Sequence, residues 1–119
     1  MAIPTYDKFY RPILKLLYDG QIHNSKEMIS FAARDFKLSK EDMALILPSG
    51  RQTVLSNRVG WARTYLKKAG LIETPARGQY RIMPLGKKLL EDKAVTIDNA
   101  CLMNYKGFRN FVRPMETQN

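Results

Sequence analysis

Cysteine and histidine are nearly missing from this sequence of 119 residues, which contains one of each, Cys101 and His23. A single cysteine cannot form an intramolecular disulfide, and one cysteine with one histidine cannot complete a structural zinc site. No serine–histidine–aspartate, cysteine–histidine, P-loop or paired-acid arrangement can be assembled either. We therefore expect no cofactor, no metal and no catalytic centre, with Cys101 a small apolar filler and His23 a turn or strand residue.

Long apolar runs are also missing, because no stretch reaches the roughly 18 residues that suggest a membrane span. The N-terminus carries Asp7 and Lys8 inside its first apolar-periodic segment, which is unlike a signal peptide. Binding to a membrane surface would need a basic helix with an exposed apolar face, whereas these helices need their apolar faces for a core. The length fits one domain, and we expect a cytoplasmic protein with no membrane partner.

Acidic residues are scarce in one region. Residues 49–90 hold nine basic residues and one acidic residue, Glu73, and so contribute +8 of the net charge of +9. Residues 1–48 contribute +1 (seven basic, six acidic) and residues 91–119 contribute 0 (four and four). Because the excess is regional, it predicts a polyanionic partner.

The spacing of apolar residues predicts three helices in the first part of the chain. The first spans residues 4–19, and residues 21–23 could form an edge strand. A capping-box pattern at residues 24–27 opens a second helix that continues to Phe36, and a similar pattern at residues 39–42 opens a short third helix. The apolar residues of this third helix are expected to face inward; they are Met43, Leu45 and Ile46.

Residues 51–69 are typical of one long helix, whose apolar residues fall within a narrow arc at 100° per residue. The members of this arc are Leu55, Val59, Ala62, Leu66 and Ala69. Residues 71–73 and 79–82 are typical of strands joined by a turn, and Pro84 begins a last helix. This order predicts a mainly α domain with a small β-hairpin, a winged helix-turn-helix, over residues 1–92, followed by a less regular tail or linker over residues 93–119.

The long helix and the hairpin provide a candidate interface for double-stranded DNA. Asn, Gln and Arg can bond base edges, Ser and Thr can bond phosphates, and a small residue permits close approach. Arg51 and Gln52 are expected at the helix N-terminus, which attracts phosphate. Arg77 would project from the hairpin tip, with Gln79 and Arg81 facing outward behind it. The predicted contacts are Arg51, Gln52, Thr53, Ser56, Asn57, Gly60, Arg63, Thr64, Lys67, Lys68, Arg77, Gln79 and Arg81.

Several residues of this region also have ordinary structural explanations. A glycine inside a helix costs about 1 kcal/mol relative to alanine, and either approach to DNA or packing against a neighbouring element would explain Gly60. Arg58 could contact DNA or form an internal ion pair. The lysine pair at 67–68 could be a solvated face, although its clustering with arginines favours DNA. Trp61 and Tyr65 are expected to pack against another element instead of stacking on nucleic acid.

Three segments resemble the N-terminal domain of Mrr-type restriction proteins. They are Ile3-Pro-Thr-Tyr-Asp7, Leu47-Pro-Ser-Gly-Arg-Gln52 and above all the run NRVGWARTYLKKAGLI from Asn57 to Ile72. Residues 78–82 and 85–86 fit the wing and last helix of that domain, so the resemblance extends from residue 3 to about residue 92. Residues 105–111 are similar to the segment that often leads out of that domain.

The resemblance implies a winged-helix domain that targets a type IV restriction nuclease to methylated DNA. In that family the cutting belongs to a separate C-terminal domain of the PD-(D/E)xK type, whose carboxylates and lysine surround a divalent metal. Residues 93–119 are too few to build such a domain, and we interpret Glu91-Asp-Lys93 as a chance match. We expect the chain to bind DNA without cleaving it, with a nuclease domain in cis or in trans.

Two other functions stay open, because winged helices serve many purposes. One is a transcription regulator that binds an operator, for which a homo-oligomer with matching half-sites would be expected. The other is a protein-interaction winged helix with an incidental basic face. The sequence leaves the oligomeric state and the recognised base undetermined.

Overall fold

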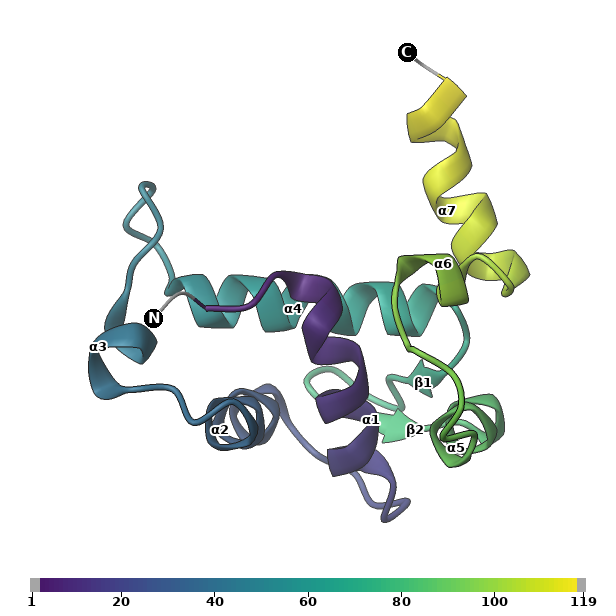
Figure 1. Cartoon of the computed structure of the whole chain (residues 1–119), viewed down its shortest axis with the longest axis horizontal. Coiled ribbons are helices and arrows are strands. Elements are labelled where there is room, and N and C mark those ends of the chain that lie inside the picture. Colours follow the sequence, from purple (N-terminus) through teal and green to yellow (C-terminus); the bar gives the residue numbers. More distant parts are fainter. Residues whose placement is uncertain (1–2, 118–119) are drawn as a thin grey trace.

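One long helix organises the fold (Figure 1). The computed structural model describes residues 3–117, with side chains to residue 112. A 3-10 helix, η1 (Tyr6–Phe9), leads into α1 (Tyr10–Leu17), α2 (Ser25–Asp35), α3 (Lys40–Ala44) and the long α4 (Val54–Lys68). Strands β1 (Ile72–Glu73) and β2 (Arg81–Ile82) follow, and then α5 (Pro84–Glu91), α6 (Asn99–Leu102) and α7 (Lys106–Thr117). α1 crosses α4, while α7 projects from the other elements near one end of α4.

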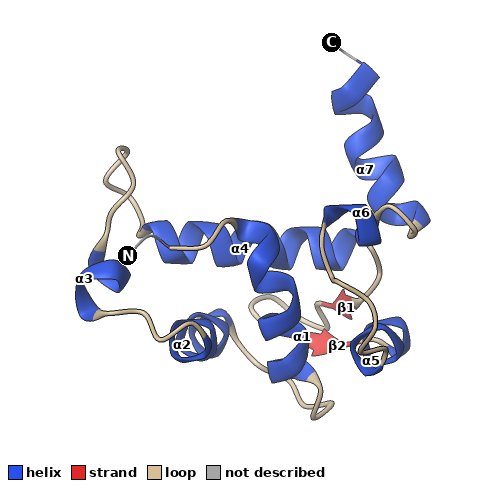
Figure 2. Cartoon of the chain, viewed as in Figure 1, coloured by secondary structure: helices blue, strands red, loops and turns tan. Residues whose placement is uncertain are grey.

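The sheet is small and antiparallel, so the chain is mainly α with a short hairpin, as predicted (Figure 2). Ile72 pairs with Ile82, and Glu73 pairs with Arg81. His23 adds an isolated antiparallel bridge to Tyr80, in which each backbone N–H donates to the other residue's carbonyl at 2.9 Å. The expected edge strand is therefore present as one bridged residue. The order of helices, bridge and hairpin agrees with a winged-helix arrangement.

Side-chain caps determine where the central helices begin. The Asn24 side chain accepts from the Glu27 N–H at 2.9 Å while the Glu27 carboxylate accepts from the Asn24 N–H, which completes the predicted capping box of α2. Ser39 and Asp42 make the same reciprocal pair at the start of α3. The Thr53 hydroxyl caps α4 by accepting from the Ser56 N–H at 3.0 Å. These three caps fix α2, α3 and α4 as separate helices.

The apolar arc of α4 lies in the core, as predicted. Its five members, Leu55, Val59, Ala62, Leu66 and Ala69, are all buried. They share one cluster with the buried residues of α1 and with Met28, Ala32 and Ala33 of α2. Because this side of α4 lies in the core, the residues of the opposite side remain partly exposed.

Two predictions about the region before α4 are wrong. The helix begins at Val54 and not at residue 51, because residues 45–54 form a narrow turn with an Ile46–Thr53 bridge. In this turn the Val54 N–H donates to the Leu45 carbonyl at 2.9 Å. Leu45 adopts an extended ψ of 130° and so ends α3. As a result Met43, Leu45 and Ile46 face solvent, with 37%, 49% and 60% of their surface exposed, although inward positions were expected.

The prediction of less regular structure after residue 92 is also wrong for the described residues. The Asp98 carboxylate accepts from the Cys101 N–H at 2.9 Å and caps α6. Ile97, Cys101, Leu102 and Phe108 are buried in the common core, which confirms Cys101 as an apolar filler. Within residues 3–117, no helix has the length and apolar character needed to cross a membrane.

Candidate nucleic-acid interface

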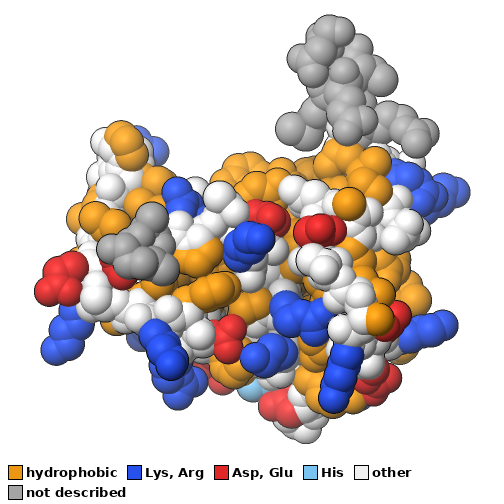
Figure 3. All heavy atoms as spheres, in the orientation of Figure 1, with side chains coloured by type: hydrophobic (Ala, Val, Ile, Leu, Met, Phe, Trp, Pro, Cys, Tyr) orange, Lys and Arg blue, Asp and Glu red, His pale blue; other side chains and the backbone are white. Residues whose placement is uncertain are grey.

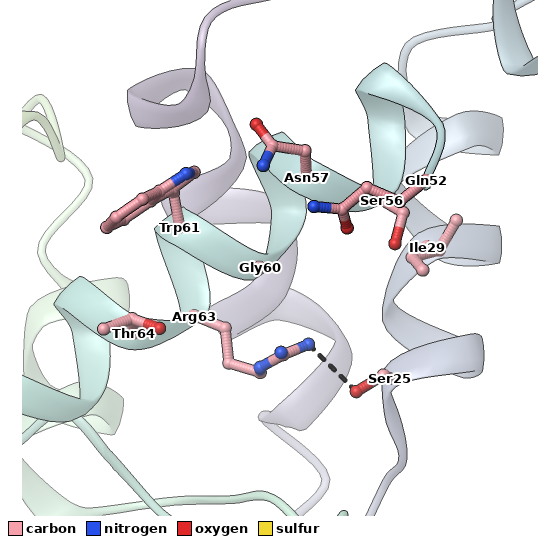
Figure 4. A pocket seen from close by; sticks show the side chains of 9 residues that line it. All are labelled: Ser25, Ile29, Gln52, Ser56, Asn57, Gly60, Trp61, Arg63 and Thr64. Atoms are coloured by element: carbon pink, nitrogen blue, oxygen red, sulfur yellow. Dashed lines mark hydrogen bonds between the residues drawn. The ribbon is translucent and has the colours of Figure 1, made fainter. Parts of the chain in front are cut away.

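The outward face of α4 and residues of α2 line an open hollow of about 400 Å³ (Figure 4). Six of the predicted contacts meet in it: Gln52, Ser56, Asn57, Gly60, Arg63 and Thr64. Three residues that were not among the predicted contacts complete its lining: Ser25, Ile29 and Trp61. Amide, hydroxyl and guanidinium groups therefore converge on one surface of α4.

Gly60 forms part of the floor of this hollow. A Cβ built at this position would meet only the Arg63 Nη2 atom, at 3.7 Å, once the helix's own backbone is set aside. That distance is an ordinary van der Waals contact, so no neighbouring element requires a glycine here. Of the two explanations considered for Gly60, packing against another element is therefore not supported.

Arg63 is held in place by two contacts. Its Nη1 donates to the Ser25 hydroxyl at 2.9 Å, and its guanidinium lies 4.9 Å from the ring centroid of Tyr80. These contacts connect α4 to the start of α2 and to the hairpin. A guanidinium carries five N–H donors, so an arginine fixed in this way can still bind an acceptor in the hollow.

The hairpin divides its predicted contacts into two kinds. Arg77 and Gln79 are exposed at the turn, where Gly78 has a φ of +76° and the Gln79 N–H donates to the Ala76 carbonyl. Arg81 instead donates from Nε and Nη2 to the Glu73 carboxylate, at 2.8 and 2.5 Å. Both partners of this pair are partly exposed, so the pair is screened by solvent. Arg77 is thus the hairpin cation that is available to a partner.

The remaining basic residues also differ in their surroundings. Lys67 and Arg51 are exposed, and neither side chain has an ion pair or hydrogen bond within the described part of the chain. The Lys68 Nζ lies 5.0 Å from the ring centroid of Phe111 on α7. Arg58 donates from Nη1 to the carbonyls of Ile3 and Pro4, so it holds the N-terminal segment against α4. Arg58 therefore has a structural role, although its partners are carbonyls instead of an acid.

Charges of both signs occur elsewhere on the surface. On the face of the molecule that Figure 3 shows, basic and acidic side chains are interspersed with apolar surface. This mixture contrasts with the lining of the hollow, where Arg63 is the charged residue and no acidic side chain is present. An anion would therefore meet no repulsion from the lining of the hollow itself.

His23 lies between α1 and α2, two residues before Ser25. Its Nδ1 and Nε2 lie 3.0 Å from carboxylate oxygens of Glu27 and Asp19, respectively. Burial lowers the pKa of His23, but the hydrogen bonds to the two carboxylates outweigh burial and leave the pKa raised. The pKa values of Asp19 and Glu27 are lowered, mainly by hydrogen bonds from the backbone N–H groups of Gln21 and Asn24 and then by His23. The three side chains connect the end of α1 to the start of α2, and the backbone bridge between His23 and Tyr80 holds this segment beside the hairpin.

Trp61 is the main residue of the hollow that the sequence placed differently. Its ring lies 5.9 Å from that of Tyr65, which belongs to the same helix, so this contact is not the expected packing against another element. Instead, 48% of its surface is exposed, and it lines the hollow. At 100° per residue, Trp61 lies about 40° from Asn57 around the helix. Because Asn57 was expected to face outward, this spacing could have indicated an outward position for Trp61 as well. Ser25 and Ile29 could not be found in this way, because they come from α2.

Comparison with known proteins assigns the region that contains this surface to a family. The profile of the Mrr N-terminal domain matches residues 6–92. The chain belongs to the Mrr N-terminal domain family. The type IV methyl-directed restriction enzyme EcoKMrr of Escherichia coli (strain K12) is 38% identical to it over 87 residues. The aligned region is 72% of this chain and 28% of the length of that relative. No solved structure matches the chain significantly.

The part of the chain that matches the Mrr N-terminal domain contains every predicted contact, from Arg51 to Arg81. It ends at the close of α5, so α6 and α7 lie outside it. α7 nevertheless packs on α4, where Phe108 and Phe111 have ring centroids 5.6 and 5.7 Å from that of Tyr65. The Asn99 amide of α6 donates to the Tyr6 hydroxyl and accepts from the Tyr10 hydroxyl, which connects α6 to η1 and α1. In this chain the Mrr N-terminal domain is therefore extended by a helical layer.

Proposed function

We propose that this Mrr N-terminal domain binds double-stranded DNA through the outward face of α4 and the tip of the β1–β2 hairpin. The observation that carries the proposal is the hollow, which gathers groups able to bond base edges, namely Gln52, Asn57 and Arg63. Hydroxyl groups and the glycine floor lie between them. Lys67 and Arg77, exposed on the adjoining surface, would contact phosphates.

The dimensions of α4 support this docking. A helix of 15 residues is about 22 Å long, and the major groove of B-DNA is wide enough to admit a helix. With α4 in the groove, the hairpin would lie along the neighbouring backbone. Wing contacts of this kind would add affinity more than sequence discrimination, because they reach phosphates and not base edges.

We further propose that the domain directs a nuclease to methylated DNA and does not itself cut. The name of the EcoKMrr relative describes a methyl-directed restriction enzyme, most of whose length lies outside the aligned region. Among the described residues, no group of three or more His, Cys, Asp or Glu side chains is placed to hold a metal ion. In this proposal the nuclease is another domain, in cis or in trans. The segment after residue 92, which packs on the domain as far as Val112, would connect to a nuclease in cis.

Fluorescence anisotropy tests the proposal. The chain would be titrated onto matched methylated and unmethylated duplexes over a series of salt concentrations. Phosphate contacts predict a linear fall of log affinity with log salt, with a slope of about −0.9 for each phosphate neutralised. A steep slope with tighter binding to the methylated duplex is the expected result.

The other outcomes separate the remaining functions. A steep slope with equal affinity for both duplexes would overturn the methylation part of the proposal and favour an operator-binding regulator. Absence of binding at low salt would overturn DNA binding altogether and favour a protein partner. Because both duplexes carry the same phosphates, the comparison isolates the methyl group.

A further inference from the structure

The exposure of Trp61 is not explained by the fold. It is the only tryptophan of the chain, and 48% of its surface is open at the edge of the hollow. Tryptophan is a large apolar residue that proteins usually bury for most of its surface. In Figure 4 the indole ring projects from α4 on the side opposite to Ile29 and Ser25. One wall of the hollow is therefore an exposed aromatic ring.

The ring packs against Tyr65, which belongs to an aromatic cluster. Tyr65 lies 5.9 Å away and is itself packed against Tyr6, Phe108 and Phe111, at centroid distances of 5.3, 5.6 and 5.7 Å. This cluster joins η1, α4 and α7. Because the indole packs against Tyr65 on one side, a ligand in the hollow would meet a partly pre-positioned apolar surface, and Trp61 would lose less side-chain entropy on binding than an unsupported ring.

Polar groups surround the exposed part of Trp61. Asn57 precedes it by four residues and Thr64 follows it by three, so both are its neighbours on the surface of α4. Gly60 lies between them on the floor of the hollow. A base edge that bonds the Asn57 amide would therefore lie beside the indole ring.

Resting on the DNA binding proposed above, we propose that Trp61 is a specificity-determining residue that contacts the C5 methyl group of a pyrimidine in the major groove. That methyl group is the apolar feature of a base pair's major-groove edge, which otherwise presents hydrogen-bond donors and acceptors. A phosphate contact fits this wall less well, because phosphates are held by cations and N–H groups. Thymine and 5-methylcytosine carry the same methyl group, so the chemistry is shared between them.

Matched duplexes distinguish the two sources of the methyl group. In one kind of pair, one duplex carries thymine where the other carries uracil. In the second kind, one duplex carries 5-methylcytosine where the other carries cytosine. The substituted position is moved along a short duplex, one base at a time. We expect the wild-type chain to bind one methyl-bearing duplex more tightly than its partner, by roughly fourfold, which is the effect of burying one methyl group. The base that gives this difference identifies the source.

Variants then assign the difference to Trp61. We expect Trp61→Ala to bring the affinity ratio of the matched duplexes close to one while leaving the salt slope unchanged. Trp61→Phe should keep part of the ratio, since a phenyl ring still offers apolar contact. Lys67→Ala is the control: it should weaken both members of each pair equally and flatten the slope. Thermal unfolding of each variant establishes that it is folded.

The tryptophan emission gives an independent readout. Because Trp61 is the sole tryptophan, its intensity and wavelength should change when a duplex fills the hollow. A wild-type chain that binds DNA with unchanged emission, and whose Trp61→Ala variant keeps the same affinity ratio, would overturn this inference and leave the proposed DNA binding intact. Equal affinity of the wild-type chain for both members of every pair would overturn it too. Absence of DNA binding would overturn both.

Discussion

Replacing Gly60 with alanine should change stability and DNA binding in opposite directions. Glycine inside a helix is less favourable than alanine by roughly 0.5–1 kcal/mol. The new methyl group would meet only the Arg63 Nη2 atom at 3.7 Å, so no clash offsets the gain. We expect the free energy of unfolding to rise by about this amount and the Tm to rise by roughly 2–5 °C.

DNA binding should weaken in the same variant. The methyl group would occupy the floor of the hollow, where the proposed complex brings α4 against the bases. Displacing a closely packed surface by one carbon costs about 1–2 kcal/mol, which corresponds to roughly 5- to 30-fold in affinity. Circular dichroism would follow thermal unfolding, and anisotropy would measure affinity on one duplex at constant salt.

Gly107→Ala provides the matched control. Here a Cβ would lie 2.2 Å from the backbone carbonyl oxygen of Lys68, because α7 crosses the end of α4 at close range. Because a backbone atom can move aside only if the helices shift, we expect the free energy of unfolding to fall by about 1–3 kcal/mol. A stabilised Gly60→Ala variant with wild-type affinity would refute the reasoning that DNA approaches the floor. A Gly60→Ala variant that is less stable than the wild-type chain would refute the argument that alanine stabilises α4 at this position.

Two further predictions concern charge. Lys67→Ala should reduce the salt slope of DNA binding by about 0.9, since one phosphate contact is lost; an unchanged slope would show that Lys67 contacts no phosphate. The pKa of His23 is higher in the folded than in the unfolded state. Protonated His23 therefore stabilises the fold at pH values below its unfolded-state pKa of about 6.5, and this stabilisation is lost as pH rises through the folded-state pKa. The lowered pKa values of Asp19 and Glu27 stabilise the fold above their unfolded values of about 4, and this contribution is lost as pH falls. Urea unfolding should therefore show a local contribution that is greatest between about pH 5 and 6.5. His23→Ala should remove the loss of stability at high pH, whereas the loss at low pH should largely remain, because the backbone N–H groups of Gln21 and Asn24 still donate to Asp19 and Glu27. An unchanged high-pH profile in that variant would contradict the role of His23.

Local signals were sufficient for much of the fold. The caps at Asn24 and Ser39 depend on residues three positions apart, so sequence alone could place the starts of α2 and α3. The buried arc of α4 followed from helical periodicity over four turns, which also placed Asn57 and Thr64 on the opposite face. The hairpin followed from Pro75 and Gly78 between two apolar segments.

Tertiary contacts decided what the sequence could not. Helical spacing over a helix as short as α3 does not define a face, so Leu45 and Ile46 were placed inward although they form an exposed turn. Thr53 was placed within the helix although it is the cap. The order after residue 92 depends on burial of Ile97 and Phe108 against distant elements, which no local pattern specifies.

The hollow itself shows the same limit. Helical periodicity predicts which residues of α4 line the hollow. It cannot predict the residues that α2 contributes, because Ser25 meets Arg63 across a sequence separation of 38 residues. Exposure of Trp61 was missed because aromatic residues are usually buried. In both cases the missing information lies in how the helices pack, and not in any one segment.

Amide chemical shifts, followed by NMR while a short duplex is added, would test most directly whether the outward face of α4 binds DNA. We predict that the largest changes occur at Asn57, Gly60 and Thr64, with smaller changes at the hairpin tip around Arg77. Changes confined to the exposed turn at Leu45 and its neighbours, with α4 unaffected, would contradict the proposed interface.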